Sequence, residues 1–158
     1  MLYFDTSALM PYYRPEPLSA EIQALLIQAQ EQVVISRLVE VEFASVLARL
    51  VRMGDLDARS AGVIQTAFSQ DIARNCYRVL ELASVHFKQA RDWLLERKAP
   101  LRTLDALHLA VAQISDTRLV TSDVGLRVQP RNMGWLWSSL PAMLLQESKI
   151  RSSGFVDQ

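Results

Sequence analysis

LYFDTSAL, residues 2–9, is the stretch that decides the fold. It begins with the apolar residues Leu2, Tyr3 and Phe4 and meets a polar turn at Asp5. A short apolar run that stops at a polar turn predicts a buried strand. A carboxylate is costly to bury unless something positive compensates it. Asp5 is therefore both the predicted end of a strand and a candidate functional side chain.

Strand-like and helix-like segments alternate along the rest of the chain. Apolar runs of strand length lie at 33–35, 77–80, 118–121 and 134–137, and helical patterns lie at 18–29, 37–53, 55–68, 84–97 and 103–114. Prolines at positions 11, 15 and 17 predict a loop after the first strand. Ser36 is a candidate N-cap and Gly54 a candidate terminator of the helix over 37–53. The alternation predicts an α/β fold, with a central parallel sheet flanked by helices on both faces.

Three further acidic residues sit singly in apolar segments, as Asp5 does. They are Glu42 in VEVEFASVLARL, Asp105 in LRTLDALHLAVA and Asp123 in RLVTSD. Parallel sheets bind ligands outside the carboxyl ends of their strands, so these acids are expected to share one crevice. Carboxylates held together repel one another unless a cation intervenes, and an all-oxygen set suits Mg²⁺ or Mn²⁺. Helical spacing does not choose between Glu40 and Glu42 as the second acid.

Composition and charge limit the classes of protein to which this chain can belong. A chain of 158 residues is expected to form one main domain. Its formal net charge of +0 means that binding to a polyanion requires a local patch of cations. Candidates for such a patch flank the acidic segments: Arg49, Arg52, Arg97, Lys98 and Arg102. The single cysteine excludes an intramolecular disulfide, and the absence of a signal peptide or an apolar membrane span predicts a cytoplasmic protein with no membrane partner.

The acidic segments resemble a known family. LYFDTSAL, ISRLVEVEFASVLARL, LRTLDALHLAVA and LVTSD look like the four motifs of PIN-domain ribonucleases, in order and at typical separations. The chain is most similar to the VapC-type toxins of type II toxin–antitoxin pairs. The resemblance implies a PIN-like, Rossmann-like domain over residues 1–137 and leaves 138–158 as a C-terminal tail with at most a short helix. It also favours Glu42 over Glu40, because Glu42 lies six residues beyond Ser36.

The resemblance further implies an activity and its partners. The family hydrolyses RNA phosphodiester bonds with metal-activated water. Carried onto this chain, Asp5, Glu42, Asp105 and Asp123 would ligate Mg²⁺ or Mn²⁺, and Thr121 would bond a ligand carboxylate or the scissile phosphate. A small antitoxin and a second copy of the chain are the expected protein partners.

Two further details concern the comparison with the family, one an agreement and one a departure. Thr6 or Ser7 would support Asp5 through a hydroxyl group. The segment VGLRVQPRNMGWLWSSLP departs from the family pattern, because Pro130 stands where a helix is usual. The last helix and strand, and any dimer contact they supply, are therefore left open.

Three rival functions fit parts of the same pattern. An RNA-processing nuclease without an antitoxin would use the same acids. A phosphatase with Asp5 as nucleophile would want a second acid two residues later, where this chain has Ser7. A catalytically inactive scaffold would have lost an acid, and all four are present.

Individual polar and aromatic residues also have simpler interpretations. His108 follows Asp105 by three residues and can face the site, but a core histidine bonded to a backbone carbonyl is the favoured prediction. His86 is expected on a helix surface and Cys76 in a buried or half-buried position. The tryptophans at 93, 135 and 137 are expected in the core or an interface rather than stacked on bases.

Overall fold

Four strands lie side by side in one parallel sheet. The computed structural model describes residues 1–98 and 100–123. The strands are β1 (Leu2–Phe4), β2 (Val33–Ser36), β3 (Arg78–Leu80) and β4 (Arg118–Val120), in the order β3-β2-β1-β4. Leu2 of β1 lies opposite Val33 of β2 and Arg118 of β4. The predicted strand at 134–137, the segment around Pro130 and the tail at 138–158 lie outside the described residues.

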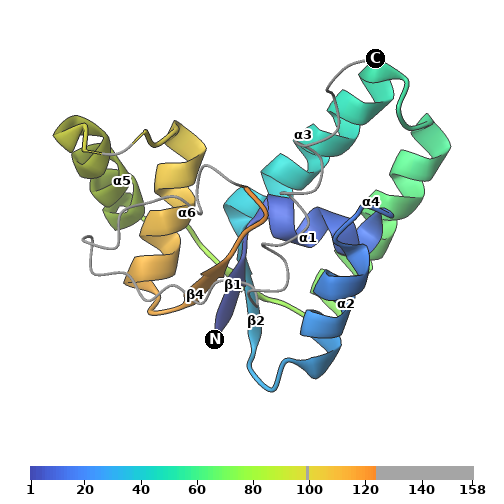
Figure 1. Ribbon diagram of the computed structural model, residues 1–158, viewed down its shortest axis with the longest axis horizontal. Helices are drawn as coiled ribbons and strands as arrows, with labels where there is room; N and C mark the ends of the chain where they lie inside the picture. The colour runs from blue at the N-terminus through green and yellow to red at the C-terminus, as the bar shows by residue number, and fades with distance from the viewer. Residues whose placement is uncertain (99, 124–158) are drawn as a thin grey trace, which may run out of the picture.

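Helices cover both faces of this sheet. They are α1 (Thr6–Tyr13), α2 (Ser19–Gln28), α3 (Arg37–Met53), α4 (Ala58–Ala73), α5 (Ser84–Glu96) and α6 (Thr103–Ile114). Figure 1 shows α5 and α6 on one side of the strands and the first four helices on the other. The predicted α/β fold is confirmed. In the part of the chain that the structure describes, no helix is both long and apolar enough to cross a membrane.

The order of the strands creates a switch point beside β1. From β1 the chain adds β2 and then β3 on one side, and it returns to add β4 on the other side of β1. Connections leave in opposite directions at such a point and open a crevice at the carboxyl ends of the strands. The Asp5 amide extends the pairing there by donating to the Val120 carbonyl oxygen at 3.2 Å. The residues after β1 and after β4 are thereby neighbours.

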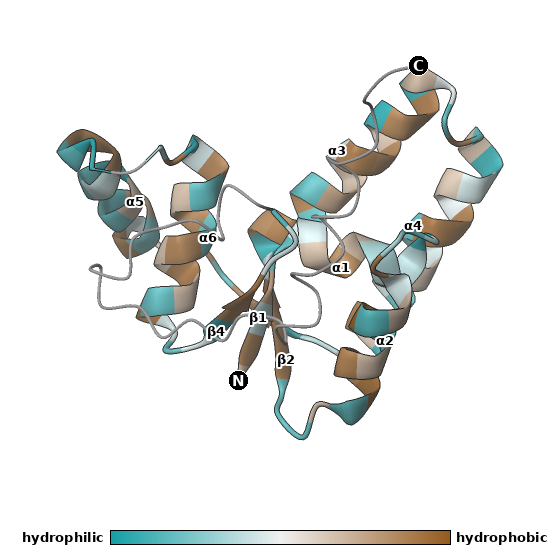
Figure 2. Ribbon diagram, in the orientation of Figure 1, coloured by the Kyte–Doolittle hydropathy of each residue, from teal (hydrophilic) through white to brown (hydrophobic). Residues whose placement is uncertain are grey.

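The core is built on the central strands and α6. Tyr3 and Phe4 are fully buried, and seven consecutive residues of α6, from Ala106 to Ala112, are buried as well. Figure 2 shows the strands largely in the brown of apolar residues. On the other face, Phe43 of α3 stacks on Phe68 of α4 with ring centroids 4.2 Å apart. The buried α6 agrees with its apolar sequence, and a helix buried on nearly all sides cannot easily shift.

Two local predictions are wrong. The proline at position 11 lies inside α1 rather than in a loop, because Asp5 caps a helix that begins at Thr6 and buries its middle residues, Pro11 among them. The loss of one hydrogen bond at Pro11 does not outweigh the cap and this burial. Cys76 is exposed, since it follows α4 in a turn rather than joining β3. Trp93 is buried, as predicted, and the other two tryptophans lie outside the described residues.

Gly54 provides a test of how α3 ends. Its φ is +79°, and its N–H donates to the carbonyl oxygens of Leu50 and Val51. Gly54→Ala should destabilise the protein by about 1–2 kcal/mol, because a Cβ disfavours the left-handed region. Gly62→Ala, inside α4 with open space around its position, should instead stabilise by about 0.5–1 kcal/mol. Urea denaturation measures both changes, and shifts of the same sign would contradict this account of the α3 terminus.

Candidate active site

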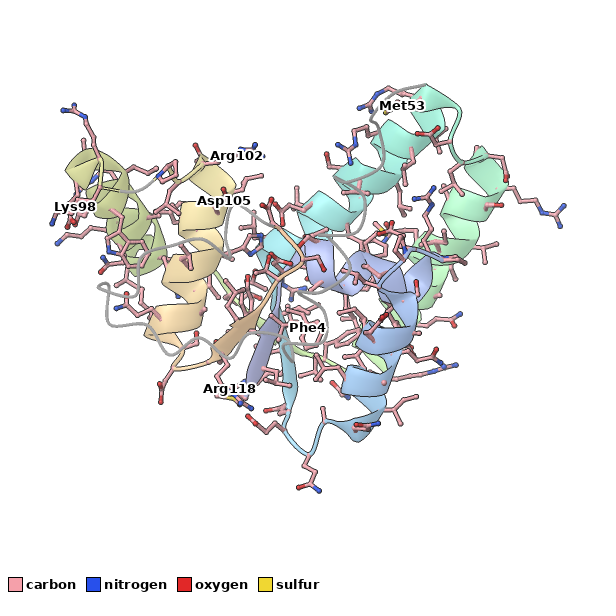
Figure 3. All side chains as sticks on the ribbon, in the orientation of Figure 1. Phe4, Met53, Lys98, Arg102, Asp105 and Arg118 are labelled. Atoms are coloured by element: carbon pink, nitrogen blue, oxygen red, sulfur yellow. The ribbon has the colours of Figure 1, made fainter. Side chains whose placement is uncertain are left out.

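A pocket of about 730 Å³ opens at the carboxyl ends of β1 and β4. Its walls come from α1, α3, the start of α6 and the residues after β4. All four predicted acids line it: Asp5, Glu42, Asp105 and Asp123. Figure 3 labels Asp105 near the N-terminal end of α6, with Arg102 just before it. Side chains more than a hundred residues apart in sequence are thus brought to one cavity, as the acidic pattern predicts.

Asp5 lies at the base of this pocket. Its side chain is the N-cap of α1, and Oδ1 accepts hydrogen bonds from the Ala8 amide at 2.9 Å and the Ser7 hydroxyl at 2.8 Å. Burial raises the pKa of Asp5 above its ordinary value, and the nearby His108 and the hydrogen bonds from Thr121, Ala8 and Ser7 act in the opposite direction without cancelling it. An ionised Asp5 is therefore costly here unless a cation compensates it.

Ser7 connects the residues after β1 to the residues after β4. Its hydroxyl donates to Asp5 and accepts from the backbone amides of Ser122 at 2.9 Å and Asp123 at 3.1 Å. Thr6 or Ser7 was predicted to support Asp5, and the structure shows that the Ser7 hydroxyl bonds its carboxylate, whereas the Thr6 hydroxyl bonds Glu42. Thr121 is buried, bonds the Asp5 carboxylate, and accepts from the Asp123 amide at 3.0 Å. Thr121 contacts a carboxylate, as one alternative of its predicted role requires, but it is not among the residues that line the pocket.

Glu42 reaches the pocket from α3. Its Oε2 accepts from the Thr6 hydroxyl at 2.6 Å and contacts His108 Nε2 at 2.7 Å. Burial raises the pKa of Glu42, but the hydrogen bond and the charge interaction with His108, together with the Thr6 bond, outweigh it and leave the pKa lowered. Glu40 instead pairs with Arg37 at 2.7 Å and does not line the pocket. This placement agrees with the choice of Glu42.

His108 is the pocket residue whose contacts were wrongly predicted. It is buried, as expected, but it bonds Tyr3 and Glu42 rather than a backbone carbonyl, and it lines the pocket. Its spacing of three residues from Asp105 was the available signal, because such residues share one face of a helix. His86 is also buried rather than on the surface, since its Nδ1 accepts from the Ala83 amide at 2.8 Å.

Two arginines line the pocket together with the acidic residues. All five candidate cations are exposed, but only Arg49 and Arg102 line the pocket, whereas Arg52, Arg97 and Lys98 do not. The Arg102 backbone amide also donates to Asp105 Oδ2 at 3.2 Å. Arginine suits bidentate contacts with phosphate. The pocket therefore combines carboxylates that suit a hard cation with guanidinium groups that suit a phosphate.

The acids do not converge on one point as their side chains stand. Among residues 1–98 and 100–123, no group of three or more His, Cys, Asp or Glu side chains could hold a metal ion in these rotamers. The chemistry of the donor set nevertheless fits Mg²⁺ or Mn²⁺, because four carboxylates line one pocket and ionised Asp5 calls for compensation. An ion shared by three or more of these acids would require other side-chain rotamers.

The family follows from comparison of the sequence with family models. The model of the PIN domain matches residues 2–131, and the chain belongs to this family. The sequence matched none of the curated proteins.

Solved structures with this fold include three bacterial proteins. VapC20 of Mycobacterium tuberculosis, described as a toxin that cleaves the sarcin-ricin loop, has 18% identity and a TM-score of 0.64, over 86% of this chain and 97% of that one. FitAcB of Neisseria gonorrhoeae has 21% identity and a TM-score of 0.64, over 80% and 90%. A toxin–antitoxin complex from Klebsiella pneumoniae has 19% identity and a TM-score of 0.54, over 78% and 87%. At these identities the likeness shows the fold alone.

Replacing Asp5 by Asn tests the cost of its charge. Because the pKa of Asp5 is raised in the folded state, its stabilising contribution is complete below the ordinary value of 3.8 and is lost as pH rises through the raised pKa. In buffer with a chelator, Asp5→Asn should therefore raise Tm at neutral pH and lose this advantage near pH 3.8. The amide oxygen can still accept the Ala8 hydrogen bond, so the cap is kept.

Asp57 supplies the matched control. It is also a helix N-cap, with its carboxylate accepting from the Ser60 amide, but it is exposed and these hydrogen bonds lower its pKa. Its contribution is present above the ordinary pKa and is lost as pH falls, so Asp57→Asn should lower Tm at neutral pH. Calorimetric scans that moved both variants in the same direction at neutral pH would exclude a special cost of burying Asp5.

Proposed function

We propose that this chain is a metal-dependent endoribonuclease and the toxin component of a VapC-type toxin–antitoxin pair. The observation that carries the proposal is the shared pocket: four carboxylates from distant segments and two arginines line it in a chain of the PIN family. Neither a structural core nor a simple binding surface calls for four buried or half-buried carboxylates in one pocket. A phosphodiester and its metal ion account for both signs of charge.

Asp5, Glu42, Asp105 and Asp123 are the residues that would hold Mg²⁺ or Mn²⁺. When bound, such an ion lowers the pKa of a coordinated water and stabilises negative charge on phosphoryl oxygens. Glu42 is held ionised without the ion because His108 and Thr6 lower its pKa. Asp5, whose pKa is raised by burial, is the acid whose ionised form gains most from a nearby cation.

The remaining polar groups position the acids and the substrate. Ser7 and Thr121 hold the Asp5 carboxylate by hydrogen bonds. Arg49 and Arg102 lie where a guanidinium can bind the phosphate groups of the RNA backbone. Since the whole chain has a formal charge of +0, this local pair is the feature that would attract the backbone.

RNA is the proposed substrate, and an antitoxin and a second copy are the proposed partners. The structural neighbours support this choice, because one is described as a toxin that cleaves the sarcin-ricin loop and another as a toxin–antitoxin complex. An antitoxin would inhibit this chain by covering the pocket with a helix or an extended tail. A cationic residue on that segment would complement the acids.

The second acid is tested by comparing Glu42→Gln with Glu40→Gln. Glu42→Gln should weaken Mn²⁺ binding by about tenfold or more and reduce cleavage of single-stranded RNA, because it removes a charge that faces the pocket. Glu40→Gln should change neither by more than about twofold, since Glu40 only pairs with the exposed Arg37. Calorimetric titration with Mn²⁺ and a cleavage assay measure the two effects. The opposite ranking would show that the second acid is Glu40.

The arginine pair is tested through the salt dependence of RNA binding. In an Asp105→Asn background, which should prevent cleavage, Arg49→Ala should weaken binding and reduce the slope of log K against log salt by about 0.7, the value for one lost phosphate contact to a single strand. Arg52→Ala is the control, because Arg52 lies three residues further along the sequence but outside the pocket. Equal slopes for Arg49→Ala and Arg52→Ala would remove Arg49 from the proposed RNA contact.

A further inference from the structure

A buried chain of hydrogen bonds leads from the middle of the sheet to Glu42. The Ser36 hydroxyl lies 2.8 Å from the Tyr3 hydroxyl, which lies 2.7 Å from His108 Nδ1. His108 Nε2 in turn lies 2.7 Å from Glu42 Oε2. Ser36 and Tyr3 are 0% exposed and His108 is 3% exposed. Four elements, β2, β1, α6 and α3, each contribute one member of this chain.

An ionised Glu42 gives the chain one direction of donation. A carboxylate accepts only, so His108 Nε2 must carry the hydrogen that lies between them. In a neutral imidazole, Nδ1 is then the acceptor and Tyr3 must donate to it. The Tyr3 oxygen is left to accept from Ser36. Every buried hydroxyl in the chain is satisfied by this arrangement, and reversing any one bond would leave two donors or two acceptors facing each other.

We infer that Tyr3 and His108 are positioning residues for Glu42: Tyr3 holds the His108 ring through Nδ1, and Nε2 of that ring orients the Glu42 carboxylate as a ligand. This inference rests on the proposed function, since it names what prepares one of the proposed metal ligands. Residues that bond a ligand in this way orient it and strengthen its binding. Thr6 supports the same oxygen from α1, and the described part of the chain places both hydrogen bonds to Glu42 on Oε2. Oε1 would thereby be the oxygen available to the ion.

Packing alone does not explain the Tyr3 hydroxyl. A phenylalanine would fill the same space in the sheet without a buried hydroxyl group, and burying one is unfavourable unless it is bonded. Tyr77 offers the comparison, because its hydroxyl is also bonded, to Tyr13 at 2.7 Å, but in a cluster with Asp71 away from the pocket. The two tyrosines differ in what their hydroxyl groups reach.

The first test is spectroscopic and needs no metal. Nitrogen-15 spectra of the imidazole rings should show His108 with Nε2 protonated and Nδ1 accepting a hydrogen bond. Tyr3→Phe should shift the His108 Nδ1 resonance, because Nδ1 loses the hydroxyl group that bonds it. His86 is the only other histidine in the chain, and it is an internal control, because its Nδ1 accepts from the Ala83 amide and does not contact Tyr3. Unchanged His108 resonances in Tyr3→Phe would overturn the inference.

The second test measures the consequence for the ligand. Tyr3→Phe should weaken Mn²⁺ binding by about tenfold, and Tyr77→Phe, which also loses one hydroxyl, should leave it unchanged. His108→Leu should weaken binding at least as much as Tyr3→Phe, whereas His108→Gln should restore part of it, because a glutamine amide can donate to Glu42. Equal losses in Tyr3→Phe and Tyr77→Phe would mean a general loss of stability and would overturn the inference.

The two proposals fail in different ways. If the unaltered chain binds Mn²⁺ and cleaves RNA but the Tyr3 and His108 variants bind the ion normally, only the positioning role is wrong. If the unaltered chain neither binds Mn²⁺ nor cleaves RNA, the proposed function is wrong and the positioning of a metal ligand is wrong with it. The histidine spectrum then shows a hydrogen-bond chain that serves the core alone.

Discussion

The site depends on the burial of one carboxylate, that of Asp5, at the end of the central strand. Its oxygens are satisfied by the Ala8 amide, the Ser7 hydroxyl and the Thr121 hydroxyl. The Ser7 hydroxyl also accepts hydrogen bonds from two backbone amides of the segment after β4. The groups that make the buried charge tolerable therefore also join β1 to β4. The same hydrogen bonds support both the fold and the site. Removing the acceptor oxygens of Asp5 would therefore also disturb the switch point of the sheet.

The surroundings of Asp5 and Glu42 shift the pKa values of these two acids in opposite directions. The pKa of Asp5 is raised because desolvation outweighs its hydrogen bonds, whereas the pKa of Glu42 is lowered because His108 and Thr6 outweigh its partial burial. Environments that separate two carboxylates in this way assign them different tasks. The lowered pKa favours the ionised form of Glu42, which lines the pocket. The raised pKa of Asp5 means that the folded chain disfavours its ionised form, and in the proposed site a cation would compensate that charge.

The fold was predictable from the sequence because its elements have local signals, namely apolar runs and helix-terminating residues such as Gly54. The four acids were found because single charges in apolar segments are conspicuous. The partners of His108 were not predictable in this way: Tyr3 lies 105 residues away and Glu42 lies 66 residues away. Helical periodicity places His108 on the face of Asp105 but carries no information about contacts across the sheet. The prediction of a loop at Pro11 was wrong because it gave the proline more weight than the N-cap at Asp5.

The bonds around Asp5 also argue for hydrolysis by water rather than through a phosphorylated aspartate. Oδ1 of Asp5 accepts two hydrogen bonds, one from the Ser7 hydroxyl and one from the Ala8 amide in the N-cap of α1, so this oxygen is committed to the fold. Position seven, where a phosphatase of this kind would want a second acid, holds a serine whose hydroxyl is committed to Asp5 and to the segment after β4. An acid there would repel Asp5 and remove the donor that stabilises it. The hydroxyl at position seven thus suits an acid that holds a cation and does not suit one that attacks phosphorus.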